Sequence, residues 1–115
     1  MPRADVVVVG AGLAGLTAAI ALADAGARVE LVARGHAATH WTPGGFDCAA
    51  PSSAPTSTAG IERLAAREGH PYGILAGDVR PGLAFVRSVV GETGLIYRGE
   101  LDEDRKSTRL NSSHQ

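Results

Sequence analysis

A glycine-rich run near the start of the chain has the spacing that phosphate chemistry requires. Residues 10–15 read Gly-Ala-Gly-Leu-Ala-Gly. In this pattern Gly10 makes a tight turn, Gly12 lets a pyrophosphate approach the backbone, and Gly15 lets a helix pack closely on a strand. The amides and the dipole at the start of a following helix then attract an anion. The expected contacts to a nucleotide cofactor here are Gly10, Ala11, Gly12, Leu13, Ala14 and Gly15.

This motif has meaning only between a strand and a helix. Residues 6–9 are four consecutive valines, typical of a strand buried on both faces of a parallel sheet. Residues 13–25 have apolar side chains at helical spacing, and Gly26 is suited to end the helix. Residues 28–32 alternate like a second strand. The pattern predicts an α/β fold: the N-terminal part of a Rossmann-like, FAD- or NAD(P)-binding parallel sheet, formed by a βαβ unit and a partial continuation.

The tip of the second strand lacks the acidic residue that usually holds a ribose hydroxyl. Ala33 occupies that position, and Glu30 lies inside the strand, where alternation directs its side chain elsewhere. Three alternatives stay open for the ligand: a flavin dinucleotide bound without this clamp, a mononucleotide, or a 2′-phosphate recognised by Arg34 in an NADP site. The structural alternative is that Arg34 is a solvated loop residue.

Residues 35–58 show neither helical nor strand periodicity, and connections of this length are usually functional or disordered. His40 is a candidate contact to flavin or to a substrate phosphate, or a proton-transfer group with an unperturbed pKa of about 6.5. A loop histidine bonded to nearby backbone is the alternative. Gly44 and Gly45 are expected either to allow close backbone approach to the ligand or to form a plain turn. Trp41, the only tryptophan, is more typical of a core anchor than of a shield over a cofactor ring.

The later elements are shorter or less regular. Residues 61–67 predict a short helix, which Gly69, His70 and Pro71 would stop. Residues 79–90 predict another helix with Pro81 in its first turn, where proline is tolerated. Residues 95–97 predict a short strand.

Composition limits the classes of function. A chain of 115 residues allows one small domain or a piece of a larger one. The formal net charge of −1 argues against a nucleic-acid partner, and no apolar run approaches the roughly 18–20 residues of a membrane span. The single cysteine permits no internal disulfide and no zinc cluster, so we predict no metal site and a reducing compartment.

The last twelve residues differ in composition from the rest. They hold the only lysine, asparagine and glutamine, whereas residues 1–103 contain eight arginines and no lysine. The segment also resembles a sequencing adapter translated in one frame. We therefore expect residues 1–103 to be an incomplete dinucleotide (flavin)-binding domain and residues 104–115 to be a non-native, disordered tail. The natural protein would then be longer.

Residues 5–32 resemble the N-terminus of the two-dinucleotide-binding-domain flavoproteins. More narrowly, residues 31–47 resemble the family formed by the B subunit of anaerobic glycerol-3-phosphate dehydrogenase. That family has a small uncharged residue before Arg/Lys-Gly, and then His-aromatic-Ser-Ser-Gly-x-Leu-Asp. The run His-Pro-Tyr at residues 70–72, followed by Leu75, matches a second family element. Thr42 and Pro43 replace the paired serines and Phe46 replaces the leucine, which alters ligand contacts but not the flavin class.

The resemblance implies a flavin enzyme, with FAD or FMN, that oxidises sn-glycerol 3-phosphate to dihydroxyacetone phosphate by hydride transfer from C2 to the flavin. It implies a complex with a larger flavin subunit and an iron–sulfur subunit that feeds membrane quinones. The location implied is cytoplasmic, or peripheral at the inner face of the membrane through a partner. The fragment alone is expected to be inactive. Two alternatives stay open: an NADP-binding oxidoreductase domain that uses Arg34, and a non-catalytic subunit for electron relay or assembly.

Overall fold

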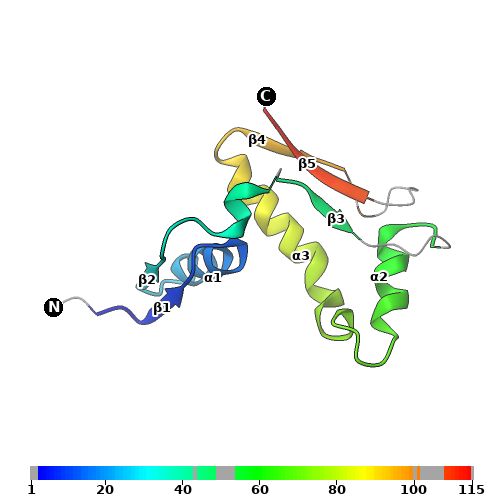
Figure 1. The fold of residues 1–115 in the computed structure, drawn as a ribbon, viewed down its shortest axis with the longest axis horizontal. Helices are drawn as coiled ribbons and strands as arrows, with labels where there is room; N and C mark the ends of the chain where they lie inside the picture. Colours follow the sequence, from blue (N-terminus) through cyan, green and yellow to red (C-terminus); the bar gives the residue numbers. More distant parts are fainter. Residues whose placement is uncertain (1–2, 43, 49–53, 100, 102–107, 115) are drawn as a thin grey trace. The chain divides into compact units, whose positions relative to one another are not determined.

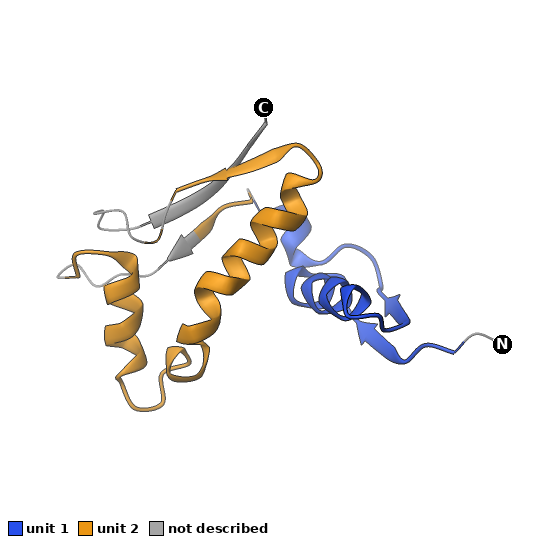
Figure 2. Cartoon of the chain, turned by 180° about the vertical axis from the view of Figure 1, so that it is seen from behind, with its two compact units in different colours: residues 1–43 blue, residues 44–115 orange. Residues whose placement is uncertain are grey.

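The structure, a computed structural model, describes residues 3–42, 44–48, 54–99, 101 and 108–114. The chain divides into two compact units, residues 1–43 and 44–115 (Figure 2). The boundary between them falls in the aperiodic loop of residues 35–58, whereas the sequence predicts a boundary after residue 103.

The first unit is a βαβ motif (Figure 1). It contains β1 (Val6–Val9), α1 (Leu13–Asp24) and β2 (Val29–Val32). The two strands are parallel, with Val6 opposite Val29 and Val9 opposite Val32. The helix α1 contacts both strands. The predicted βαβ unit and α/β class are confirmed.

Glycine ends α1 as the sequence predicts. Gly26 has a φ of 92°, a conformation that residues with a Cβ rarely adopt. Its N–H donates to the carbonyl of Ala23 at 2.9 Å, and the N–H of Ala27 donates to the carbonyl of Leu22 at 3.0 Å. These bonds satisfy carbonyls at the end of the helix and turn the chain toward β2.

An ion pair joins the starts of the two parallel strands. The Arg28 guanidinium donates to Oδ1 of Asp5 at 2.9 Å, and the Arg28 backbone N–H donates to Oδ2 at 2.8 Å. Both bonds lower the pKa of the Asp5 carboxyl below its ordinary value, and the side-chain bond from Arg28 has the larger effect. Both side chains are exposed, so the pair adds little to the stability of the unit.

The second unit contains two helices that both begin earlier than predicted. Helix α2 spans Ser57–Ala65, because Thr56 caps it and accepts from the N–H of Ala59 at 3.1 Å. Helix α3 spans Tyr72–Gly91. The N–H of Tyr72 donates to Nδ1 of His70 at 3.1 Å. His70 lies after the end of α2, and through this bond it also helps to start α3.

Pro81 lies well inside α3, and the prediction that it occupies the first turn is wrong. A proline there removes one helical hydrogen bond. Tertiary packing compensates, because α3 places a stripe of partly buried side chains against Ile61 and Leu101. The side chains of this stripe are Tyr72, Ala76, Val79 and Leu83.

The second unit also contains a three-stranded antiparallel sheet. Its strands are β3 (Phe46–Cys48), β4 (Leu95–Arg98) and β5 (Thr108–His114), in the order β3-β5-β4. The predicted strand at 95–97 is therefore confirmed, but it does not continue the parallel sheet of β1 and β2.

Residues 108–114 form the middle strand β5, at a place where the sequence predicts a disordered tail. Phe46 pairs with Leu110 on one side, and Leu95 pairs with His114 on the other. The hydrogen bonds of such a sheet are made by main-chain groups. A polar segment can therefore pair with two open strand edges, whatever side chains it carries. Residues 102–107 lie outside the described residues, and the non-native origin of the segment stays a prediction.

Few of the side chains that the structure describes are fully covered. Among the described residues, the buried hydrophobic ones are Ala54, Ile61 and Leu101. The burial of β1 alternates, with Val7 56% and Val9 82% exposed, so the prediction of a strand buried on both faces is wrong for the unit as described. Within the described residues, no helix combines the length and apolarity of a membrane span.

Residues 1–103 produced alone are expected not to unfold cooperatively, because so little apolar surface is removed from water. Thermal circular dichroism and calorimetry would test this, together with binding of a dye that reports exposed apolar surface. The full-length protein, treated identically, is the control. A sharp calorimetric transition of residues 1–103 would contradict the expectation.

Candidate functional site

The turn between β1 and α1 has the geometry that the glycine motif predicts. Gly10 directly follows β1 and has a φ of 105°, which a side chain would strain. Its N–H donates to the carbonyl of Val32 at 2.8 Å, so the turn stays attached to the end of β2. Helix α1 then begins at Leu13, with Gly12 as its N-cap residue.

Gly15 is required by the packing of the protein itself. A Cβ atom at this position would lie 2.0 Å from the carbonyl oxygen of Gly10 and 3.0 Å from its carbonyl carbon. Both atoms are backbone, so no side-chain rotation can relieve the overlap. This confirms that the third glycine allows α1 to pack closely on the turn after β1.

Gly12 is not required by packing. A Cβ atom here would lie 3.5 Å from Cβ of Ala37 and 3.7 Å from Oγ1 of Thr39, which are ordinary van der Waals distances. Its φ of −79° is open to any residue. The fold therefore has room for a methyl group at this position, and glycine leaves that room unfilled beside Ala37 and Thr39.

The start of α1 is suited to an anion. The first N–H groups of a helix have no partners within the helix, and they carry its positive dipole end. Gly12 offers no side-chain cap, and the first turn contains no acidic residue that would repel a phosphate. Ala11 and Ala14 add only methyl groups around these amides.

The chain after β2 lacks a ribose clamp, as predicted. Ala33 and Arg34 both follow the strand directly and are exposed. Glu30 lies within β2, opposite Val7 in the register, and not at the tip of the strand. The exposed side chain of Arg34 thus follows the strand, and its role in selecting a 2′-phosphate stays a prediction.

A cavity of about 260 Å³ lies beside the turn. It is bounded by the start of α1 and by the segment that contains the short 3-10 helix η1 (Ala38–Trp41), which the sequence does not predict. The imidazole rings of His36 and His40 stack there, with centroids 4.2 Å apart and planes 15° apart. The residues that line the cavity are Ala11, Leu16, Gly35, His36, Ala37, Thr39 and His40.

His40 thus lies beside the glycine motif, within the same unit. Its ring also contacts Trp41 edge-on, with centroids 4.9 Å apart. Trp41 is 77% exposed, so the expectation of a core anchor is wrong for the described structure. His36 and Thr39 also line the cavity, although the sequence analysis does not single them out as site residues. The four-residue spacing of the histidines is a signal that could have indicated the pair.

Gly44 and Gly45 belong to the second unit, just before β3. Gly44 has a φ of 78°, which fits a turn that only glycine forms without strain. Their role as cofactor contacts stays a prediction.

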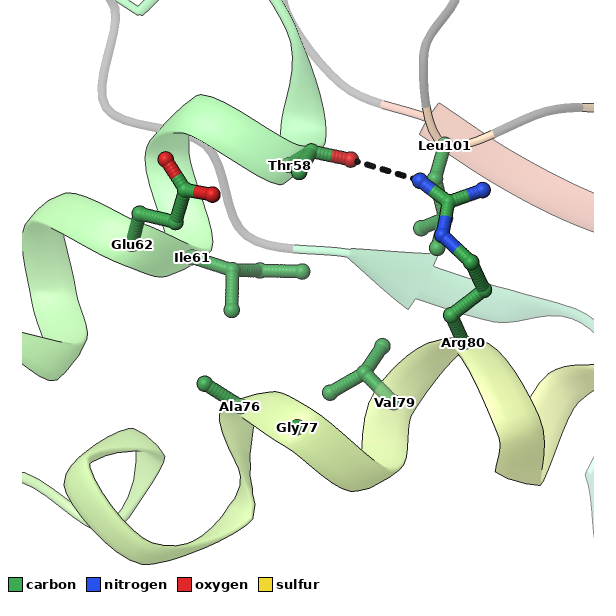
Figure 3. A pocket seen from close by; sticks show the side chains of 8 residues that line it. All are labelled: Thr58, Ile61, Glu62, Ala76, Gly77, Val79, Arg80 and Leu101. Atoms are coloured by element: carbon green, nitrogen blue, oxygen red, sulfur yellow. Dashed lines mark hydrogen bonds between the residues drawn. The ribbon is translucent and has the colours of Figure 1, made fainter.

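A second cavity, of about 230 Å³, lies between α2 and α3 (Figure 3). Arg80 reaches across it and donates to Oγ1 of Thr58 at 3.3 Å. The remaining lining is mostly apolar: Ile61, Glu62, Ala76, Gly77, Val79 and Leu101. None of the residues predicted for cofactor binding lies here. In the described ranges there is also no group of three side chains suited to hold a metal ion.

Comparison with known proteins supports the flavin among the open cofactor alternatives. The family model described as "FAD binding domain" matches residues 5–71, more than half of the chain and all of the βαβ unit. The chain belongs to the FAD binding domain family. The match confirms the predicted flavin cofactor and indicates FAD in particular.

Two curated relatives are both named as the B subunit of anaerobic glycerol-3-phosphate dehydrogenase, which confirms the resemblance seen in the sequence. The protein of Pectobacterium atrosepticum is 32% identical over 118 aligned residues, covering 98% of this chain and 25% of the relative. That of Pectobacterium carotovorum subsp. carotovorum is 40% identical over 75 residues, covering 61% of this chain and 18% of the relative. The chain thus spans about a quarter or less of these relatives. No solved structure matches it.

The two glycines of the helix start are expected to behave differently when substituted in the full-length protein. Gly12→Ala should fold normally but bind FAD about ten-fold or more weakly, because its methyl group enters the space kept for the pyrophosphate. Gly15→Ala should also lower the melting temperature, because of the overlap with Gly10. Titration of apoprotein with FAD and thermal melts measure the two effects. Unchanged FAD affinity in Gly12→Ala would contradict the role given to that residue.

Proposed function

We propose that the full-length protein is an FAD-dependent oxidoreductase that converts sn-glycerol 3-phosphate to dihydroxyacetone phosphate. The observation that carries the cofactor part is the contrast between Gly12 and Gly15. One glycine is needed by the fold, and the other leaves space at the start of α1 that the fold does not use. The substrate part rests on the names of the two relatives.

The chain's own contribution is to bind and orient the cofactor. The first-turn amides of α1 other than that of Leu13, which donates to Thr39 Oγ1, would hold the pyrophosphate. The helix dipole would contribute about 0.3–1 kcal/mol per charge at an exposed site. The bond from Gly10 to Val32 would keep the turn beside the end of β2, where the ribose is expected. The flavin, when bound, supplies the hydride-accepting chemistry, and the protein supplies position and electrostatics.

His40 is the side chain that we propose to contact the flavin or a substrate phosphate. It lies on the cavity wall beside the start of α1, and its ring is held on two sides by His36 and Trp41. Ring contacts on two sides limit the orientations open to the imidazole, which would suit hydrogen bonding to a ligand. Gly44 and Gly45 are proposed as points of close backbone approach.

We propose that the protein works in a complex. The relatives are named as one subunit of a dehydrogenase, which supports partner subunits. The resemblance suggests a larger flavin subunit and an iron–sulfur subunit that passes electrons to membrane quinones. On this proposal the protein is cytoplasmic or held peripherally at the membrane by a partner, and the 115-residue chain alone is inactive.

The full-length protein is expected to be purified as a yellow protein with flavin absorption bands. Release of the cofactor by denaturation, followed by chromatography, should identify FAD and not FMN. Reduction of a dye acceptor by sn-glycerol 3-phosphate should occur with the partner subunits present. Measurement with and without these partners separates an enzyme from a subunit that serves only assembly or electron relay.

A colourless protein that neither flavin reconstitutes would overturn the proposal. If that protein bound NADPH in preference to NADH, and Arg34→Ala removed the preference, the NADP alternative would replace it. Arg34→Ala in a flavin-loaded protein should leave FAD bound, because the family match and the helix start do not depend on this side chain.

A further inference from the structure

The start of α1 obtains its cap from a distant part of the chain. The backbone N–H of Leu13 donates to Oγ1 of Thr39 at 3.1 Å, although the two residues are 26 positions apart. Helix N-termini are usually capped by the residue just before them, but Gly12 has no side chain to do this. Thr39 is therefore placed directly at the anion-binding end of the helix.

The conformation of Thr39 is fixed by its own loop. Its carbonyl accepts from the hydroxyl of Thr42 at 2.9 Å and from the N–H of Thr42 at 3.3 Å. The N–H of His40 donates to the carbonyl of Ala37 at 3.0 Å. Thr39 also lies in sequence between His36 and His40, whose rings stack on each other. The hydroxyl is thus presented by an ordered turn, and it lines the 260 Å³ cavity.

The bond to Leu13 leaves the hydroxyl with a hydrogen to donate. A threonine hydroxyl has one donor and two acceptor positions, and the Leu13 N–H occupies one acceptor position. In the part of the chain that the structure describes, Thr39 Oγ1 donates to no acceptor. A hydroxyl that accepts from a helix amide becomes a better donor, because chains of hydrogen bonds polarise one another.

A ligand is expected here on separate grounds. The family match covers residues 5–71 and so includes both Leu13 and Thr39. FAD carries a doubly charged pyrophosphate whose oxygens only accept hydrogen bonds. The space left open by Gly12 borders Thr39, since a Cβ at position 12 would lie 3.7 Å from its Oγ1. The pyrophosphate that uses this space would meet the hydroxyl.

We propose that Thr39 is a cofactor-binding residue whose hydroxyl, held by the Leu13 N–H, donates a hydrogen bond to the pyrophosphate of FAD. It extends the row of backbone donors at the start of α1 by one O–H group. The inference rests on the proposed function in one respect: FAD must bind at the β1–α1 turn. It adds a side chain that the glycine motif does not contain.

The test compares three variants of the full-length protein by titration of the apoprotein with FAD and with ADP, which keeps the pyrophosphate but lacks the flavin. Thr39→Val keeps the shape of the side chain and removes the hydroxyl. This variant should bind both FAD and ADP about ten-fold more weakly than the wild type, as expected for the loss of one hydrogen bond to a charged group. Thr39→Ser keeps the hydroxyl, so its affinities for FAD and ADP should stay within about two-fold of those of the wild type.

Thr42→Val is the matched control. It removes a hydroxyl from the same loop, but one that donates to the Thr39 carbonyl and not to the helix start. It should change FAD affinity much less than Thr39→Val. Melting temperatures of the apoproteins, measured in parallel, show whether any variant has lost the fold. A Thr39→Val protein that melts like the wild type and binds FAD weakly supports the inference.

Several results would overturn it. If Thr39→Val binds FAD as well as the wild type does, the hydroxyl makes no contact. If it binds FAD more tightly, the hydroxyl competes with the phosphate for the Leu13 N–H instead of assisting it. If FAD affinity falls but ADP affinity does not, the lost contact is not to the pyrophosphate. In these cases the wild type still binds FAD, so the proposed function stands. A wild type that binds no FAD overturns both.

Discussion

The close approach of α1 to the backbone of Gly10 determines how the first unit is built. With no Cβ at Gly15, the carbonyl of Gly10 can lie against the helix, at a place where an added carbon would be 2.0 Å from the oxygen. The same turn gives its N–H to Val32, so the start of the helix and the end of β2 meet in one place. The conformation of Gly10 and the packing at Gly15 are therefore two demands on one short segment, and the proposed space for a ligand at Gly12 would be a third.

The first unit was predictable because its signals are local. A run of valines, apolar residues at helical spacing and a glycine after the helix each act within a few residues, and β1, α1 and β2 follow them. The glycine part of the site was predictable for the same reason. Thr39 was not, because its contact with Leu13 joins residues 26 positions apart and depends on a turn, η1, that has no periodicity to detect.

The second unit shows why the full extent of α3 and the strand β5 could not be predicted. Helix α3 continues through Pro81 because the stripe that it packs on Ile61 and Leu101 lies on both sides of the proline. Strand β5 forms from a polar segment because β3 and β4 offer main-chain partners. In both cases the decisive partner is distant in sequence. The polar composition of residues 104–115 describes their side chains, whereas the pairing of residues 108–114 uses their backbone.

Trp41 makes the tryptophan fluorescence of the molecule a probe of one site. The chain contains one tryptophan, so ultraviolet emission from an indole originates at this ring alone. The indole lies edge-on to His40, with ring centroids 4.9 Å apart, and is 77% exposed. The tryptophan fluorescence of the chain is therefore a local signal from the segment that follows β2, and any rearrangement of the paired imidazoles changes the surroundings of its source.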